Sequence, residues 1–328
     1  MGRIRGNKMK NIQKFNSVEK LELGGIEQYC IIRAEDVSKP VMLFLHGGPG
    51  VPEYFIMKEE NKQLQKYFIM VYWEQRGAGK SYCRDKRNCN LTTKQLIEDT
   101  KELSEILINR FNKEKIYIMG HSWGSMLGLL TVQKYPELFY AYLGIGQVSN
   151  QYEAEKESLQ WIKHRADELN DKKGLKKIQT LTLPEPLADV KEWDYYLRVH
   201  RKYLLKYGGT YHQKVSMLKF LKDFLFVSEY TLKDKIMLIP SAFYSLKCLW
   251  HDVVSINLYQ EISSIDVPVY IFQGVHDYQV SYALAKKFFD NLKAPKKQFL
   301  TFENSAHSPI TEEYHSFNEK VIFISENA

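Results

Sequence analysis

The chain alternates between short apolar runs and longer stretches in which apolar residues recur every three or four positions. The apolar runs lie at 41–48, 68–77, 115–122, 140–146, 267–274 and 297–304. Runs of this kind, apolar on both alternating faces, are typical of buried parallel strands that helices cover on each side. Ahead of them, residues 18–33 predict a hairpin that turns at Gly24 and Gly25.

Helical patterns fill most of the segments between these runs. The clearest is 92–111, where apolar residues recur at helical spacing behind a capping-box signal formed by Thr92 and Gln95. The alternation predicts an α/β fold with a mostly parallel sheet and helices on both faces. Residues 148–264 show only helical or irregular patterns, so we expect a helical cap inserted into one core formed by 16–147 and 265–328.

Composition and charge exclude several classes of protein. The 328 residues are 44% hydrophobic and 26% charged, as in ordinary soluble globular proteins. The net charge of +7 is spread along the chain with no recognisable nucleic-acid module, so no nucleic-acid partner is expected. No apolar run approaches the length of a membrane span. The basic residues 1–15 lack an apolar core, which favours a disordered leader over a secretory signal and predicts a cytoplasmic protein without a membrane partner.

The cysteines and histidines give no sign of a metal or cofactor. Cys30, Cys83, Cys89 and Cys248 form no CxxC pair and no Cys/His metal spacing, and the chain has no HExxH. Reduced thiols are therefore the favoured state, although the short separation of Cys83 and Cys89 leaves open that these two pair. The oligomeric state also stays open.

The segment GHSWGS at 120–125 places Ser122 in a G-x-S-x-G pattern, between an apolar run and a stretch of helical character. Such a serine sits at a sharp strand-to-helix turn, where Gly120 and Gly124 allow close backbone contact. The turn lifts the hydroxyl out of the sheet and puts a helix N-terminus beneath a developing oxyanion. Ser122 is thus predicted to be a nucleophile, while a purely structural turn is the alternative.

A serine hydroxyl needs a base to activate it, and the base needs an acid to orient it. Asp277 follows the apolar run at 267–274, and His307 follows the run at 297–304, so both lie in loops after predicted strands and in the order that this type of sheet requires. Three other histidines are rivals that the pattern places less well: His121, His276 and His315.

The segment HGGPG at 46–50 follows the first buried run and is predicted to supply part of an oxyanion hole. The Trp123 amide would give one hydrogen-bond donor and a glycine amide of the 47–48 turn the other. A phosphate-binding loop is the competing interpretation of these glycines, but no Lys-Ser/Thr pair and no Rossmann acid follow at the required positions.

Together, HGGPG, WEQRGAGKS at 73–81, GHSWGS, GVHD at 274–277 and NSAHSP at 304–309 resemble the α/β-hydrolase superfamily. More narrowly, they are similar to the proline iminopeptidase (prolyl aminopeptidase) branch of serine peptidases. The resemblance implies Ser122 as nucleophile, Asp277 as acid and His307 as base, with the amides of Gly48 and Trp123 in the oxyanion hole.

The same resemblance implies that Glu74, Gln75 and Arg76 support the floor of the site, with Arg76 structural rather than catalytic. The family's aspartate in this stretch is Glu74 here. The implied activity is that of a serine hydrolase without cofactor, an aminopeptidase that releases N-terminal residues from short peptides through an acyl-enzyme.

The predicted cap departs from the family pattern. Family peptidases hold the substrate's free amine with cap glutamates, yet 236–260 contains only Asp252. Three glutamates at the start of the cap are expected to lie on a solvated helix face: Glu153, Glu155 and Glu157. A carboxylesterase acting on small esters is therefore one alternative, and a non-hydrolytic ligand-binding protein of the same fold is another.

Overall fold

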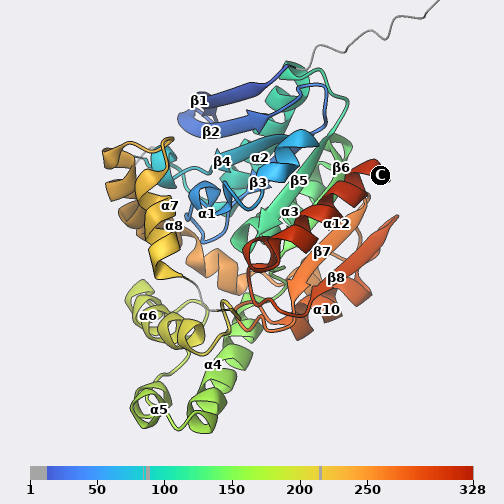
Figure 1. Cartoon of the computed structure of the whole chain (residues 1–328). Coiled ribbons are helices and arrows are strands. Elements are labelled where there is room, and N and C mark those ends of the chain that lie inside the picture. The colour runs from blue at the N-terminus through green and yellow to red at the C-terminus, as the bar shows by residue number, and fades with distance from the viewer. Residues whose placement is uncertain (1–12, 84, 86–88, 214–215, 328) are drawn as a thin grey trace, which may run out of the picture.

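A single eight-stranded sheet runs through the middle of the computed structural model, which describes residues 13–83, 85, 89–213 and 216–327 (Figure 1). The strands are β1 (Phe15–Leu23), β2 (Ile26–Ala34), β3 (Val41–Leu45), β4 (Ile69–Glu74), β5 (Ile116–His121), β6 (Phe139–Ile145), β7 (Val269–Gly274) and β8 (Lys297–Phe302). Their order across the sheet is β1-β2-β4-β3-β5-β6-β7-β8. β1 and β2 form the predicted hairpin, and every pair from β4 to β8 is parallel.

Alternate side chains of the strands enter two separate apolar layers, as the two-residue period of a strand requires. In β3, Leu43 belongs to one layer and Phe44 to the other. β3 and β5 lie at the centre of the sheet, and every residue of these two strands is buried. The loops that follow β3 and β5 are therefore held at one edge of a rigid core. The parallel pairing of the strands from β4 to β8 confirms the predicted mostly parallel sheet.

Helices cover both layers. The first layer receives α2 (Thr93–Arg110), α3 (Trp123–Lys134) and α10 (Tyr282–Asn291). The second receives α1 (Tyr54–Met57), α11 (Pro309–Glu312) and α12 (Tyr314–Glu326). Three short 3₁₀ helices complete the core: η1 (Lys62–Lys66), η2 (Gly79–Ser81) and η3 (Pro136–Leu138). At the start of α2 the Thr92 side chain accepts a hydrogen bond from the Gln95 amide, which is half of the predicted capping box.

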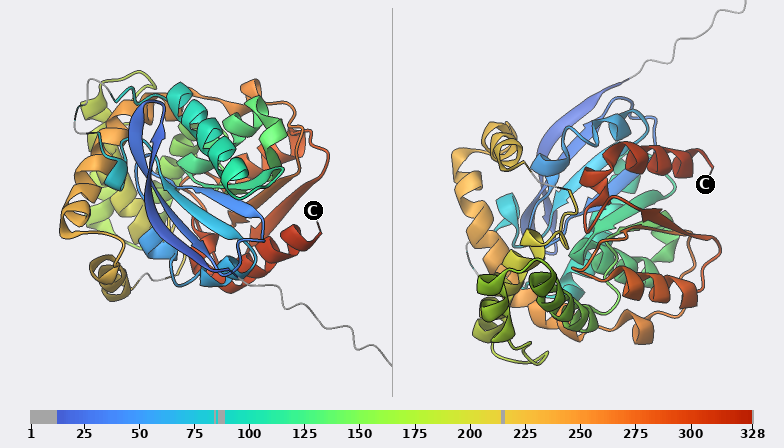
Figure 2. Two further views of the ribbon diagram at one scale, coloured as in Figure 1. Left: turned by 90° about the horizontal axis from the view of Figure 1, so that it is seen from above. Right: turned by 60° about the horizontal axis from the view of Figure 1, so that its bottom comes forward.

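The segment between β6 and β7 is helical and lies to one side of the sheet (Figure 2). It contains α4 (Gln151–Glu168), α5 (Lys172–Gln179), α6 (Val190–Lys206), α7 (Met217–Phe226), α8 (Leu232–Ser255) and α9 (Leu258–Glu261). We call these helices and their connections the cap. Within the described residues, no helix is long and apolar enough to cross a membrane.

The structure corrects one expectation and leaves another aside. Cys83 and Cys89 form a disulfide, so the expectation of reduced thiols is wrong for this pair. The sequence separation alone could not decide this, because a disulfide also requires a suitable distance between the two Cα atoms. Here that distance is 5.7 Å. The expected leader falls mostly on residues 1–12, which lie outside the described residues.

Candidate active site

Ser122 occupies a strained turn between β5 and α3. Its φ of 54° lies in the left-handed region that side chains rarely adopt, and the Ser122 amide donates to the Ile145 carbonyl at 2.9 Å. Non-glycine residues in such conformations persist only where the surrounding structure holds them, and they cluster at functional sites. The geometry is that of the predicted nucleophile elbow.

The two flanking glycines are needed because other backbone passes where their side chains would lie. A Cβ on Gly120 would come within 2.1 Å of the Gly124 carbonyl oxygen. A Cβ on Gly124 would come within 2.1 Å of the Leu45 carbonyl oxygen at the end of β3. The G-x-S-x-G spacing therefore lets the elbow close tightly against the HGGPG loop.

Asp277 and His307 meet at the same edge of the sheet. The His307 ring donates from Nδ1 to the Asp277 carboxylate at 2.9 Å, and both side chains are almost fully buried. The amides of Gln279 and Val280 donate to the other Asp277 oxygen, at 2.9 and 3.1 Å. His307 Nε2 is buried without a hydrogen-bond partner among the described residues, so it is available to take a proton.

His307 lies beside the elbow. Its ring centroid is 4.9 Å from that of His121, the residue before Ser122, and its Cε1 is 2.8 Å from where a Gly146 Cβ would be. The structure thus brings together the three predicted residues Ser122, Asp277 and His307 from the ends of three strands. Two of the three rivals are placed elsewhere: His276 stacks on His212 with centroids 3.7 Å apart, and His315 contacts Tyr314 in α12.

The HGGPG loop lies directly against Ser122. A Cβ on Gly47 would be 3.1 Å from the Ser122 Cβ, so the loop lies within contact distance of the Ser122 side chain. The Gly47 amide is occupied, since it donates to Glu53 at 3.1 Å. The Gly48 amide has no backbone acceptor among the described residues, and the Trp123 amide opens α3, where helix N–H groups have no intrahelical partner.

Gln75 connects the HGGPG loop, through His46, with Trp123 at the start of α3. Its side chain donates to the His46 carbonyl at 2.9 Å and accepts from the Trp123 indole N–H at 3.0 Å. Its backbone amide donates to His46 Nε2 at 3.1 Å, so His46 carries its proton on Nδ1, where it meets the Gly47 carbonyl. Burial lowers the pKa of His46 to about 4, which keeps this ring neutral. The indole contact gives Trp123 a structural role that sequence reasoning did not foresee.

A buried pair, Glu53 and His121, ties three loops together and was also missed by sequence reasoning. His121 Nδ1 lies 2.6 Å from a Glu53 oxygen, and His121 Nε2 donates to the His307 carbonyl at 3.0 Å. Both ring nitrogens of His121 face oxygen atoms. A neutral imidazole has only one N–H to donate, so the second contact requires one more proton on the Glu53–His121 pair. Against the effect of burial, the Glu53 charge raises the pKa of His121. With the Gly47 contact, this pair links the HGGPG loop, the elbow and the His307 loop.

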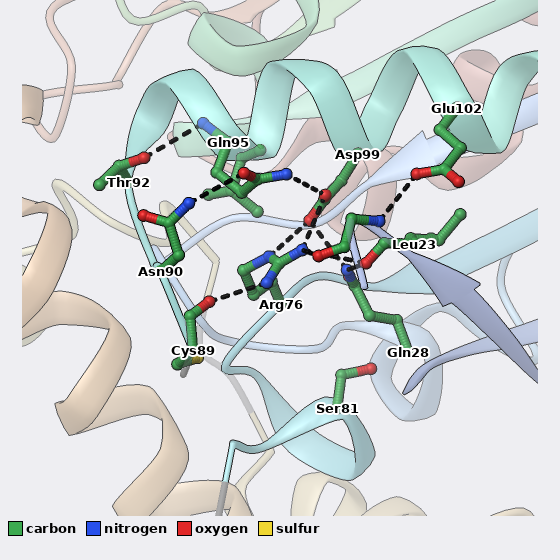
Figure 3. A network of polar contacts seen from close by, with 12 residues as sticks. Leu23, Gln28, Arg76, Ser81, Cys89, Asn90, Thr92, Gln95, Asp99 and Glu102 are labelled. Atoms are coloured by element: carbon green, nitrogen blue, oxygen red, sulfur yellow. Dashed lines mark hydrogen bonds and ion pairs between the residues drawn. The ribbon is translucent and has the colours of Figure 1, made fainter. Parts of the chain in front are cut away.

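Arg76 points into a network of polar contacts at the turn between β1 and β2 (Figure 3). Its guanidinium makes two contacts with Asp99, at 2.7 and 2.9 Å, and donates to the carbonyls of Cys89, Leu23 and Gly24. Arg76 and Asp99 are both buried, and all three nitrogens of the guanidinium donate within this network. The side chain therefore fastens α2, the hairpin and the disulfide loop to one another, as a structural role requires.

Glu74 is buried at the end of β4. Its carboxylate accepts from the Lys80 amide at 2.5 Å, and Gly79 leaves the space that this contact needs. Burial raises the pKa of Glu74 to about 7, and the nearby Tyr230 hydroxyl and Lys80 amide only partly offset this effect. Glu74 therefore supports the turn after β4 and is half-protonated near neutral pH.

A cap segment, residues 209–213, bonds to both loops that carry Asp277 and His307. The Tyr278 amide donates to the Gly209 carbonyl at 3.2 Å, and the His307 amide donates to the Thr210 carbonyl at 3.0 Å. The Glu312 carboxylate accepts from the amides of His212 and Gln213 through one oxygen and from Ala306 through the other. The cap is thus attached directly to the candidate site rather than only covering it.

The expected solvated face of the first cap helix is wrong for Glu155. This residue is fully buried in α4, with its carboxylate held by two nitrogens of the Arg201 guanidinium and by Gln151. Although burial opposes it, Arg201 lowers the pKa of Glu155. Glu157 is exposed but accepts from the Ser281 hydroxyl at 2.5 Å, and Asp252 accepts from the Thr93 hydroxyl at 2.5 Å.

Among the residues that the structure describes, no group of three or more His, Cys, Asp or Glu side chains could hold a metal ion. The chemistry that this arrangement supports on its own residues is acyl transfer. A strained serine, a buried His-Asp pair and two amides at a helix N-terminus and a glycine turn are the parts this reaction needs.

The family model for the alpha/beta hydrolase fold matches residues 40–171. The probable aminopeptidase YbaC of Bacillus subtilis (strain 168) is 34% identical over 300 residues, covering 90% of this chain and 92% of that protein. A proline iminopeptidase of Lactobacillus acidophilus is 25% identical over 319 residues, covering 92% and 96%.

Solved structures agree on the fold. VinJ superposes with a TM-score of 0.70 at 19% identity, covering 95% of this chain and 98% of the other. The proline iminopeptidase of Mycobacterium smegmatis superposes with a TM-score of 0.68 at 14% identity, again covering 95% and 98%. At such identities the likeness concerns the fold alone.

Proposed function

Because the chain belongs to the α/β-hydrolase family, in its proline iminopeptidase-like branch of hydrolytic enzymes, we propose that it hydrolyses acyl substrates through Ser122, His307 and Asp277. The observation that carries this proposal is that the strained Ser122 turn lies beside a buried His307–Asp277 pair, in which His307 Nε2 has no hydrogen-bond partner among the described residues.

In the proposed reaction the Ser122 hydroxyl attacks the substrate carbonyl carbon while His307 Nε2 takes its proton. Asp277 fixes the Nδ1–H tautomer and stabilises the imidazolium that forms. The amides of Gly48 and Trp123 hold the oxyanion of the tetrahedral intermediate. His307 then protonates the leaving group, and water attacks the acyl-enzyme by the same route to release the acid.

The substrate we propose is a short peptide with a free N-terminus, cleaved after its first residue. The full-length relative named a probable aminopeptidase and the relative named a proline iminopeptidase support this choice. An aminopeptidase must stabilise the substrate's ammonium group when the group leaves water.

A second candidate, a carboxylesterase, is favoured by the state of the acids described above. Glu155 is neutralised by Arg201, and Glu53 by His121. Each of these two carboxylates therefore already has a cationic partner and is not free to pair with a substrate's ammonium group. An ester substrate without an amine does not need such a carboxylate.

A substrate panel separates the two candidates. Prolyl and alanyl arylamides, their N-acetylated forms and short acyl esters would be offered to the wild-type chain, to Ser122→Ala, and to Ser38→Ala as an exposed serine control. The aminopeptidase proposal expects turnover of free-amine arylamides that is lost on acetylation. Turnover of esters alone supports the carboxylesterase, and any activity that survives Ser122→Ala contradicts both.

A further inference from the structure

The outer helices of the cap carry large apolar side chains that face solvent. At least half of the side chain is exposed at Leu218, Leu221, Leu225 and Phe226 in α7 and at Leu232, Ile236, Ile239 and Phe243 in α8. The two helices lie together at the left of Figure 1, and Lys235 of α8 donates to the Leu225 carbonyl of α7 at 2.6 Å. We call this set of eight residues the α7/α8 face.

The α7/α8 face is large for a monomer. If each of its side chains exposes roughly 100 Å² or more, the total is on the order of 1,000 Å², compared with a few hundred Å² for the largest apolar patch of most monomers. One partner of a standard protein–protein interface contributes about 800 Å². On this estimate, the exposed apolar area of the two helices reaches the area that one partner of a standard interface contributes.

The spacing within α8 indicates which partner fits. Leu232, Ile236, Ile239 and Phe243 are separated by four, three and four residues, which places them on one stripe of the helix. This spacing reads the same in both directions along the chain. In a two-fold symmetric contact, residue i of one copy meets residue j of the other and residue j meets residue i, and a stripe with this spacing can pair with itself in that way.

We propose that the α7/α8 face binds a second copy of this chain, with α8 packed antiparallel against α8 of the other copy. In this arrangement Ile236 lies opposite Ile239 of the other copy, and Leu232 lies opposite Phe243. The 4-3-4 spacing is that of the apolar seam by which paired helices interdigitate.

A cavity at the end of the stripe completes the fit. Phe243 lines a cavity of about 410 Å³ between α6 and α8, together with the apolar side chains of Trp193, Leu197, Leu246 and Trp250. The antiparallel register brings Leu232 of the other copy, which is 76% exposed here, to this opening. The dimer therefore places an apolar side chain against the apolar part of the lining of this cavity, whose remaining lining residues include Asp189, Lys191, Asp194, Lys247 and His251.

The test measures the mass of the full-length protein by sedimentation velocity from nanomolar to high micromolar concentration. Wild type is expected to reach twice the 38.6 kDa chain mass. The double variant Ile236→Lys/Ile239→Lys is expected to remain at the chain mass, while Leu187→Lys, at an 80% exposed leucine outside the α7/α8 face, dimerises as wild type does. Circular dichroism verifies that each variant is folded.

Cross-linking checks the register. In a Cys248→Ser background, which removes the exposed cysteine of α8, Leu232→Cys/Phe243→Cys is expected to form a covalent dimer on mild oxidation, and neither single variant is expected to do so. A monomeric wild type over the whole range overturns the proposal, as does a dimer that the double lysine variant leaves intact. Binding of a monomer to vesicles of phosphatidylcholine and phosphatidylserine, lost in the same variant, overturns it in favour of a lipid surface.

Discussion

Replacing Glu74 with glutamine removes an ionisable group from a fully buried position and keeps the shape of the side chain. The Glu74 carboxylate accepts from the Lys80 amide at 2.5 Å, and the glutamine oxygen can accept the same bond. Burial raises the pKa of Glu74 to about 7 from 4.5. The substitution therefore isolates the cost of charging this group inside the protein.

The magnitude follows from the pKa difference between the folded and unfolded chains. A rise from 4.5 to about 7 corresponds to roughly 3 kcal/mol, at 1.36 kcal/mol for each pKa unit. Because the folded state binds the proton more tightly, Glu74 contributes this stability fully below about pH 4.5 and loses it as the pH rises through about 7. Above that range the loss is complete and constant.

Urea unfolding of wild type and Glu74→Gln at a series of pH values measures this effect. The free energy of unfolding of wild type is expected to fall relative to that of the variant by roughly 3 kcal/mol across the window. Glu59→Gln is the matched control, because Glu59 is exposed and lies outside the cap. The free energy of unfolding of this variant should change with pH as that of wild type does. If the free energies of unfolding of wild type and Glu74→Gln change with pH in parallel, the pKa of Glu74 is the same in the folded and unfolded chains, and the expected effect is wrong.

Three other substitutions test the site and its support. Asp277→Asn should lower kcat by about 10⁴ and leave KM nearly unchanged, as for loss of the acid that fixes the histidine tautomer; steady-state kinetics that show a larger effect on KM would count against that role. Gly124→Ala should prevent normal folding, since its Cβ would lie 2.1 Å from the Leu45 carbonyl oxygen, and a soluble variant with wild-type circular dichroism would contradict the tight elbow. Arg76→Met should cost about 3–5 kcal/mol of unfolding free energy by leaving Asp99 buried without its cation, whereas a loss below about 1 kcal/mol would show that the pair is not a major support.

Much of the fold and the position of the candidate site followed from local sequence patterns. Buried parallel strands leave continuous apolar runs, and functional loops follow them directly, so Ser122, Asp277 and His307 could be placed at one edge of the sheet. G-x-S-x-G and HGGPG were informative because close backbone approach demands glycine there, as the contact between Gly47 and Ser122 illustrates.

The features that sequence reasoning missed depend on contacts between distant residues. Glu155 has polar sequence neighbours, as an exposed helix position would, but Arg201 on another cap helix balances its buried charge. Glu53 and His121 are 68 positions apart and meet only when the HGGPG loop folds onto the elbow. The α7/α8 face reads in sequence as an ordinary core-facing stripe, because a helix pattern does not show which surface covers it.

The central claim is that Ser122 is a nucleophile activated by His307, and covalent labelling tests it most directly. A fluorophosphonate probe would be incubated with the wild-type chain, Ser122→Ala and the exposed-serine control Ser38→Ala, and the modified residue located by peptide mass spectrometry. We expect one adduct, on Ser122, in wild type and in Ser38→Ala, and no adduct in Ser122→Ala. An adduct on another serine, or an unlabelled wild type that is folded and hydrolyses its substrate, would contradict it.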